Sequence, residues 1–232
     1  MKGEVTNVFF DLDHTLWDFE ANSTEALLEL IDLTNIQGIL GNEVKSFIQR
    51  YKEINHTYWE MYRKGEMEKA ELRIGRFRES LSEFGIENPE IHESFAKGYI
   101  EISPEKTNLF PNAKEVLEYL HEKYPMIIIT NGFEEVQWRK IKNCGIDKYF
   151  KKVVTSEMAG VRKPHPDIFR YAMGISNSIA PRSVMIGDEP SIDISGAVDV
   201  GMHAVFFDPH HKQIPSVASH TIHDLIELKS LL

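Results

Sequence analysis

Cysteine is almost absent from this sequence: Cys144 is the single one, so no internal disulfide can form. A chain without disulfides suits a reducing compartment, and we expect the protein in the cytoplasm. Cys144 lies in KIKNCGI at the end of an expected helix. A small packed hydrophobic residue is a simpler interpretation there than a nucleophile.

Long hydrophobic runs are also missing. A membrane span needs about 20 consecutive apolar residues, whereas the apolar run at residues 5–10 is far shorter and is followed by acids. We therefore expect neither a signal peptide nor a membrane anchor.

Positive charge is scarce as well, with 26 Lys and Arg against 36 Asp and Glu and a net charge of -10. Because no basic stripe overrides this balance, a nucleic acid polymer is not an expected partner. Hydrophobic residues make up 42% of the chain, which is usual for a globular protein. A chain of 232 residues can bury the core of one large domain, or of a main domain with a smaller one.

Apolar periodicity divides the chain into two kinds of segment. Residues 6–10 predict a strand, whereas apolar residues recur at helical spacing from about 20 to 102. From Pro111 onward, expected strands at 126–130, 152–156, 183–187 and 203–207 alternate with helices, and an edge strand then runs into a closing helix. This alternation predicts an α/β fold whose parallel sheet is covered on both faces.

Two acids end the first expected strand, in VFFDLDHTL at residues 8–16. Asp11 and Asp13 point the same way in an extended chain, and close carboxylates repel each other unless a cation lies between them. A calcium loop over residues 11–22 does not fit. It lacks the glycine at its turn, and Asn22 stands where the closing glutamate belongs.

Polar residues follow the other expected strands too. Beyond the next three strands stand Thr130, Asn131 and Gly132; Lys163 and Pro164; and Gly187, Asp188 and Asp193. Each group alone has a simpler interpretation as a turn or helix cap. Together, at the edge where such sheets bind ligands, they fit a phosphate bound through a hard divalent cation.

The order of these motifs resembles the haloacid dehalogenase (HAD) superfamily over nearly the whole chain. The matching segments are DLDHTL (11–16), TNG (130–132), KP (163–164) and GDEPSID (187–193). The resemblance implies a Rossmann-like three-layer core, residues 1–17 and 105–232, with the first strand central. Residues 18–104 are then an inserted all-helical cap of the C1 type that moves over the active site.

The resemblance also implies a role for each core residue. Asp11 is the expected nucleophile, which forms an aspartyl-phosphate, and Asp13 the general acid and then the general base. The expected phosphate-binding groups are Thr130, the amide of Asn131, Gly132 and Lys163.

Mg²⁺ is the cofactor that the resemblance implies. Its expected ligands are the Asp11 carboxylate, the Asp13 backbone carbonyl and the Asp188 carboxylate, with Asp193 as a supporting partner. The dehalogenase branch lacks an acid where Asp13 stands, so dehalogenation is not expected.

The helical segment should select the leaving group. Tyr58, Trp59 and Tyr62 could stack on a planar base, and Arg73 or Arg76 could contact a polar edge. Aromatic residues at helical spacing are also typical of a packed interior. Both interpretations stay open at this point.

Three short segments resemble the YjjG-type pyrimidine 5′-nucleotidases, a HAD subgroup that acts on pyrimidine nucleoside monophosphates. They are GRF (75–77), TNGF (130–133) and DPHH (208–211). The expected partner is therefore a small phosphate ester, a mononucleotide. His14 stands where that subgroup has an acidic residue. We interpret His210 and His211 as a solvated pair, because no third metal ligand is evident nearby.

Other activities use the same core. A sugar-phosphate or phosphoglycolate phosphatase would differ in the cap, and a phosphomutase would retain the phosphate on its product. A phosphonatase would need a Schiff-base lysine, for which Lys52, Lys64 and Lys69 are available. A binding module without catalysis disagrees with the complete set of acidic and basic residues.

Overall fold

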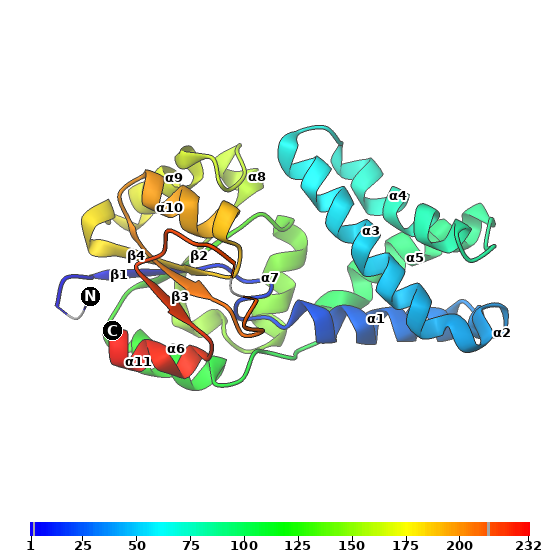
Figure 1. Cartoon of the computed structure of the whole chain (residues 1–232), viewed down its shortest axis with the longest axis horizontal. Coiled ribbons are helices and arrows are strands. Elements are labelled where there is room, and N and C mark those ends of the chain that lie inside the picture. Colours follow the sequence, from blue (N-terminus) through cyan, green and yellow to red (C-terminus); the bar gives the residue numbers. More distant parts are fainter. Residues whose placement is uncertain (2, 213) are drawn as a thin grey trace. The chain divides into compact units, whose positions relative to one another are not determined.

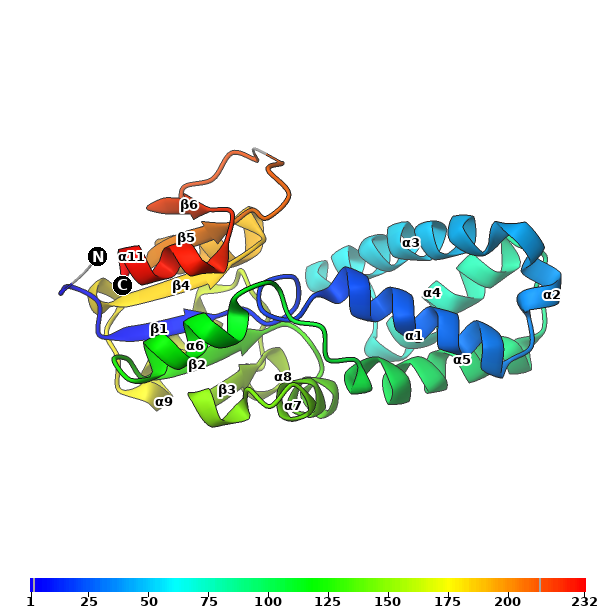
Figure 2. The same cartoon turned by 90° about the horizontal axis from the view of Figure 1, so that it is seen from below.

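One parallel sheet of six strands organises the larger part of this computed structural model, which describes residues 1, 3–212 and 214–232. The strand order is β3-β2-β1-β4-β5-β6; Figure 1 labels β1 to β4, and Figure 2 labels every strand of the sheet. The strands are β1 Asn7–Phe10, β2 Met126–Thr130, β3 Phe150–Thr155, β4 Ser183–Gly187, β5 His203–Phe207 and β6 His220–Ile222. The predicted α/β fold with a central first strand is confirmed.

The order of the strands reverses beside β1. Phe10 is paired with Ile128 of β2 on one side and with Ile186 of β4 on the other. In open parallel sheets, ligands bind at such a reversal, outside the carboxyl ends of the strands. The residues that follow β1, β2 and β4 are therefore placed where a site is expected.

Helices cover both faces of the sheet; in Figure 1, α9 and α10 lie on one side of the strands and α6 and α11 on the other. They are α6 Ala113–His121, α7 Glu134–Asn143, α8 Ser156–Ala159, α9 Pro166–Ser176, α10 Ser195–Asp199 and α11 Leu228–Leu231. On one face, α6, α7 and α11 share a core with Val8 and Phe10, and on the other, α9 and α10 share one with Phe9. Each such buried side chain contributes about 1.5–3 kcal/mol. The predicted three layers are confirmed.

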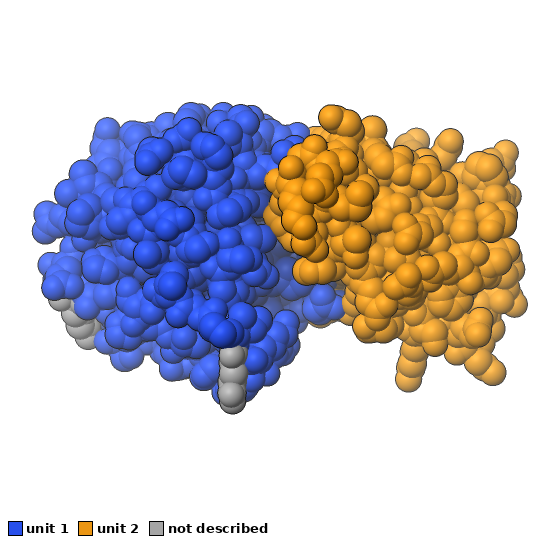
Figure 3. Space-filling model, turned by 45° about the horizontal axis from the view of Figure 1, so that its top comes forward, with its two compact units in different colours: residues 1–20, 107–232 blue, residues 21–106 orange. Residues whose placement is uncertain are grey.

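The chain divides into two compact units, coloured separately in Figure 3. The core unit comprises residues 1–20 and 107–232, and the helical unit comprises residues 21–106. The boundaries expected from the sequence follow residues 17 and 104. Among the described residues, no helix has the length and apolar character of a membrane span.

Helices and short turns make up the helical unit. Its helices are α1 Phe19–Leu33, whose first two residues belong to the core unit, α2 Gln37–Leu40, α3 Val44–Lys64, α4 Lys69–Ser82 and α5 Pro89–Ile102. Gly65, with φ of 75°, ends α3 in the left-handed conformation that favours glycine. Tyr51 and Phe77 stack at 4.9 Å between ring centroids, within a core of this unit's own.

Candidate active site

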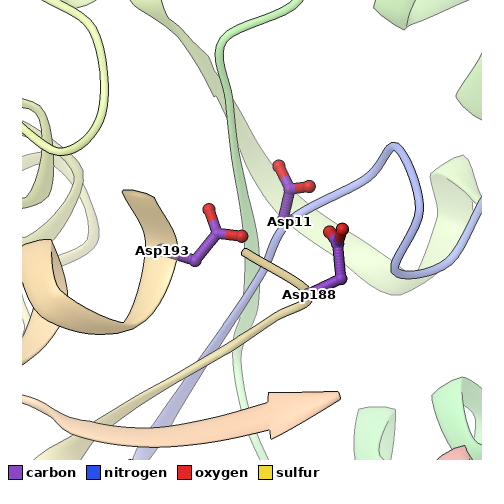
Figure 4. Close-up of side chains that lie close together, drawn as sticks. All are labelled: Asp11, Asp188 and Asp193. Atoms are coloured by element: carbon purple, nitrogen blue, oxygen red, sulfur yellow. The ribbon is translucent and has the colours of Figure 1, made fainter. Parts of the chain in front are cut away.

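Three aspartates gather at the carboxyl ends of the central strands (Figure 4). Asp11 follows β1, Asp188 follows β4, and Asp193 lies in the helical turn η5 Pro190–Ile194. One carboxylate oxygen of each lies within 4.8 Å of the others. Asp11 and Asp193 are buried and Asp188 is half-buried, so water offers little shielding between them.

Lys163 supplies the positive charge inside this cluster. Its Nζ donates to Asp11 Oδ1 at 2.5 Å and to Asp193 Oδ1 at 2.7 Å, and only 2% of the residue is exposed. The segment that carries Lys163, between α8 and α9, is held by Asn131. The Asn131 side chain accepts from the Lys163 backbone N–H at 2.8 Å and donates to its carbonyl at 3.0 Å.

The cluster holds more negative charge than Lys163 can balance. Burial and the charge of Asp193 raise the pKa of Asp11 to about 7, although Lys163 opposes the shift. Burial and the two neighbouring aspartates raise the pKa of Asp188 as well. Burial alone would lower the pKa of Lys163, but Asp11 and Asp193 outweigh it and raise that pKa.

The donor set suits a hard divalent cation. With all three aspartates ionised, one lysine leaves a surplus of two negative charges, which one Mg²⁺ would cancel. Asp193 uses both oxygens, for Lys163 and for the Glu189 N–H at 3.1 Å. Among the described residues, the second oxygens of Asp11 and Asp188 accept no hydrogen bond. These two oxygens are suited to bind a metal ion, whereas Asp193 is suited to hold its neighbours in place.

Thr15 is a residue of this site that the sequence did not reveal. It is fully buried, and its Oγ1 donates to Asp188 Oδ1 at 3.0 Å. A partner of this kind orients a metal-binding carboxylate. Gly187 leaves the room that this arrangement needs, because a Cβ there would meet the side chain of Asp193.

Asp13 lies in a separate ion pair. Lys140 Nζ donates to Asp13 Oδ1 at 2.5 Å, and Gln137 Nε2 donates to Oδ2 at 2.7 Å. Burial would raise the pKa of Asp13, but these two donors outweigh it and lower that pKa. Gln137 and Lys140 were not anticipated from the sequence. Their signal is the spacing of three positions on the helix that follows TNG, which places both on one face.

Thr130 is arranged as a hydrogen-bond donor. Its Oγ1 accepts from Gln137 Nε2 at 2.7 Å and from the Gly132 N–H at 3.0 Å. A hydroxyl accepts two hydrogen bonds and donates one, so its hydrogen remains for another acceptor. Gly132 is required here, because a Cβ at this position would collide with Gln137.

Arg76 belongs to the helical unit and is buried there. Its Nη1 donates to Asn55 Oδ1 at 2.5 Å, and its guanidinium lies 4.9 Å from the centroid of the Phe77 ring and 5.1 Å from that of Tyr99. Among the described residues its Nε has no hydrogen-bond partner. Its contact with a substrate stays a prediction.

Other residues singled out in the sequence lie apart from the acidic cluster's hydrogen bonds. Tyr58 donates to Glu79 at 2.9 Å on the helical unit. His211 stacks on His223 with 4.0 Å between the ring centroids. The group of possible metal ligands among the described residues contains neither of these two histidines. Cys144 is buried, and burial raises the pKa of its thiol to about 11, as expected of a packed residue.

This arrangement of core residues agrees with the comparison to known families. The sequence profile of the haloacid dehalogenase-like hydrolases matches residues 5–201. The chain belongs to this family. The predicted membership is thus confirmed, and the protein is a HAD hydrolase.

Two relatives of this HAD hydrolase are nucleotidases by name. Pyrimidine 5′-nucleotidase YjjG of Escherichia coli is 29% identical over 97% of this chain and 96% of its own. Pyrimidine 5′-nucleotidase PynA of Streptococcus pneumoniae is 27% identical over 88% of this chain and 84% of its own.

A solved structure resembles the HAD hydrolase along its whole length. It is the crystal structure of YfnB from Bacillus subtilis bound to magnesium, which reveals an interdomain movement. The two chains are 28% identical, each is covered to 99%, and the TM-score is 0.87.

Proposed function

We propose that this HAD hydrolase cleaves phosphate monoesters with Mg²⁺ through a phosphorylated Asp11, and that its preferred substrates are pyrimidine nucleoside 5′-monophosphates. The observation that carries the proposal is the cluster of Asp11, Asp188 and Asp193 with Lys163. Mg²⁺ and an aspartyl-phosphate are general features of the family.

Asp11 is the nucleophile in this proposal. Its carboxylate oxygen bonds to phosphorus while the bond from phosphorus to the ester oxygen breaks, and Asp13 gives the leaving alkoxide a proton. Water then attacks the aspartyl-phosphate and transfers a proton to Asp13, so that inorganic phosphate leaves and Asp11 is regenerated.

Donors around Asp11 bind the phosphoryl group. Lys163 has a third N–H beyond the two that bond Asp11 and Asp193, and the Thr130 hydroxyl has its hydrogen to donate. Asn131 holds Lys163 in place and contributes its backbone amide, beside Gly132. Such preorganised donors stabilise the charge that develops in the transition state.

Asp11, Asp188 and the backbone carbonyl of Asp13 would hold the metal, with Asp193 and Thr15 as supporting residues. When bound, Mg²⁺ supplies the positive charge that lets an anionic carboxylate approach an anionic phosphate.

The nucleotide part of the proposal is supported by two pyrimidine 5′-nucleotidases among the relatives, at 29% and 27% identity. Arg76 and the aromatic residues of the helical unit are the proposed contacts for the leaving group. A base is planar and a guanidinium or aromatic ring can stack on it.

Phosphate release tests the proposal. The panel is dUMP, dTMP, other mononucleotides, hexose phosphates and p-nitrophenyl phosphate, each with Mg²⁺ and then with EDTA. We expect dUMP and dTMP to be the best substrates, EDTA to abolish turnover, and Asp11→Asn to abolish it at an unchanged fold.

Asp199→Asn, a change to an exposed aspartate of the same unit, is the matched control and should leave turnover unchanged. Substantial activity in Asp11→Asn would refute the nucleophile. A higher kcat/KM for hexose phosphates would refute the nucleotide part alone.

A further inference from the structure

Two side chains of α7 hold Asp13, and the chemistry above has given them no role. Lys140 Nζ and Gln137 Nε2 donate to the two oxygens of the Asp13 carboxylate, at 2.5 Å and 2.7 Å. Because they are three positions apart on one helix, they reach the same carboxylate from consecutive turns. Asp13 itself lies in a loop and is half-buried, so these contacts determine where its carboxyl points.

Lys140 is held by more than the ion pair. It is 4% exposed, and its Nζ lies 3.8 Å from the centroid of the Trp17 ring. Trp17 pairs with Asp13 through an isolated backbone bridge, so the ammonium is enclosed by the loop it supports. Desolvation offsets most of the attraction in a buried ion pair, which makes such a pair weak support for stability. Orientation of Asp13 is the better explanation.

Gln137 connects Asp13 with the phosphate-binding side of the site. It is fully buried, and the same Nε2 donates to Asp13 Oδ2 and to Thr130 Oγ1, both at 2.7 Å. Oδ2 of Asp13 is the acceptor of this hydrogen bond, so the amide nitrogen of Gln137 faces Asp13. Gln137 thereby sets the distance between the proton-transfer group and the Thr130 hydroxyl.

We propose that Lys140, together with Gln137, is a positioning residue that orients the Asp13 carboxyl for proton transfer to the leaving group. The inference rests on the proposed phosphatase function. Lys140 acts through Asp13 rather than on the substrate. Its replacement should therefore lower kcat/KM most for esters whose leaving group needs a proton from Asp13.

Two esters separate this role from a structural one. The leaving group of p-nitrophenyl phosphate departs without a proton, whereas the alkoxide of an alkyl phosphate needs one. The measurement is kcat/KM of Lys140→Met for p-nitrophenyl phosphate and for the best alkyl ester of the panel. General acid catalysis typically supplies about 10²–10⁴-fold. We therefore expect a loss of about 10- to 100-fold on the alkyl ester and below about 3-fold on the aryl ester.

Further variants complete the comparison. Lys140→Arg, which keeps the charge, should recover part of the loss on the alkyl ester. Lys142→Met, an exposed lysine of the same helix, should change neither ester. Circular dichroism and thermal melting show whether Lys140→Met folds. If it does not, Lys140→Gln gives the same comparison.

A double-mutant cycle with Asp13 decides the matter. If Lys140 acts through Asp13, Lys140→Met should cost nothing further in an Asp13→Asn background. An equal loss on the two esters, or an added tenfold loss in the Asp13→Asn background, would overturn the inference. Absence of hydrolysis of every ester by the wild type would instead refute the proposed function.

Discussion

Removing the proposed nucleophile should stabilise the metal-free protein at high pH. The pKa of Asp11 is raised from 3.8 to about 7 in the folded protein, chiefly by burial. Stability from this group is therefore complete below pH 3.8 and is lost as the pH rises through about 7. Asn imitates the protonated side chain at every pH, so Asp11→Asn should avoid this loss.

The size of the effect follows from the two pKa values. Because folding shifts the pKa of Asp11 from 3.8 to about 7, ionisation of this group lowers the free energy of unfolding. The loss is about 4 kcal/mol at pH 8 and roughly 2 kcal/mol at pH 5. The advantage of Asp11→Asn should thus grow by about 2–3 kcal/mol between these pH values. For a domain of roughly 150 residues, that corresponds to about 5–10 °C in Tm.

Thermal melting in EDTA at pH 5 and pH 8 measures this difference. The wild type and Asp11→Asn are compared at each pH, with the exposed Asp199→Asn as the control for a lost surface charge. Adding Mg²⁺ at pH 8 should raise the Tm of the wild type and narrow the gap, because the cation neutralises the cluster. A gap that stays constant between the two pH values, or a wild type more stable than Asp11→Asn at pH 8, would refute the reasoning.

Two further changes test the supports of the site. Thr15→Val removes the donor to Asp188 and should weaken Mg²⁺ about 10-fold in a titration of phosphatase activity; unchanged affinity would contradict the role of Thr15. Asn131→Ala removes two hydrogen bonds to the Lys163 backbone and should lower the free energy of unfolding by about 1–3 kcal/mol in urea, with a lower kcat. An unchanged unfolding midpoint would show that Asn131 does not hold this segment.

Local patterns were sufficient to predict most of the sheet. The expected strands at 126–130, 183–187 and 203–207 coincide with β2, β4 and β5, because continuous apolar runs between turn residues mark buried strands. The strand expected at 152–156 begins earlier, at Phe150. Lys151 and Lys152 are exposed at that edge, where the backbone pairs with β2 whatever the side chains are.

The same local reading placed the candidate residues at the strand ends, and parallel topology then brings such ends to one edge. The sequence therefore allows one to predict that Lys163 lies near Asp11, which follows β1, and Asp188, which follows β4. An apolar strand followed by a polar residue is a local pattern, and it is sufficient to predict this part of the site.

Tertiary structure alone decided which polar groups support these residues. Lys140 meets Asp13 across 127 positions, and Thr15 meets Asp188 across 173. Hydrophobic periodicity predicts which face of α7 is buried. Because Gln137 and Lys140 are polar, the same pattern predicts that they are exposed to water. Their burial is favourable only because a carboxylate from another part of the chain is there to accept their hydrogen bonds.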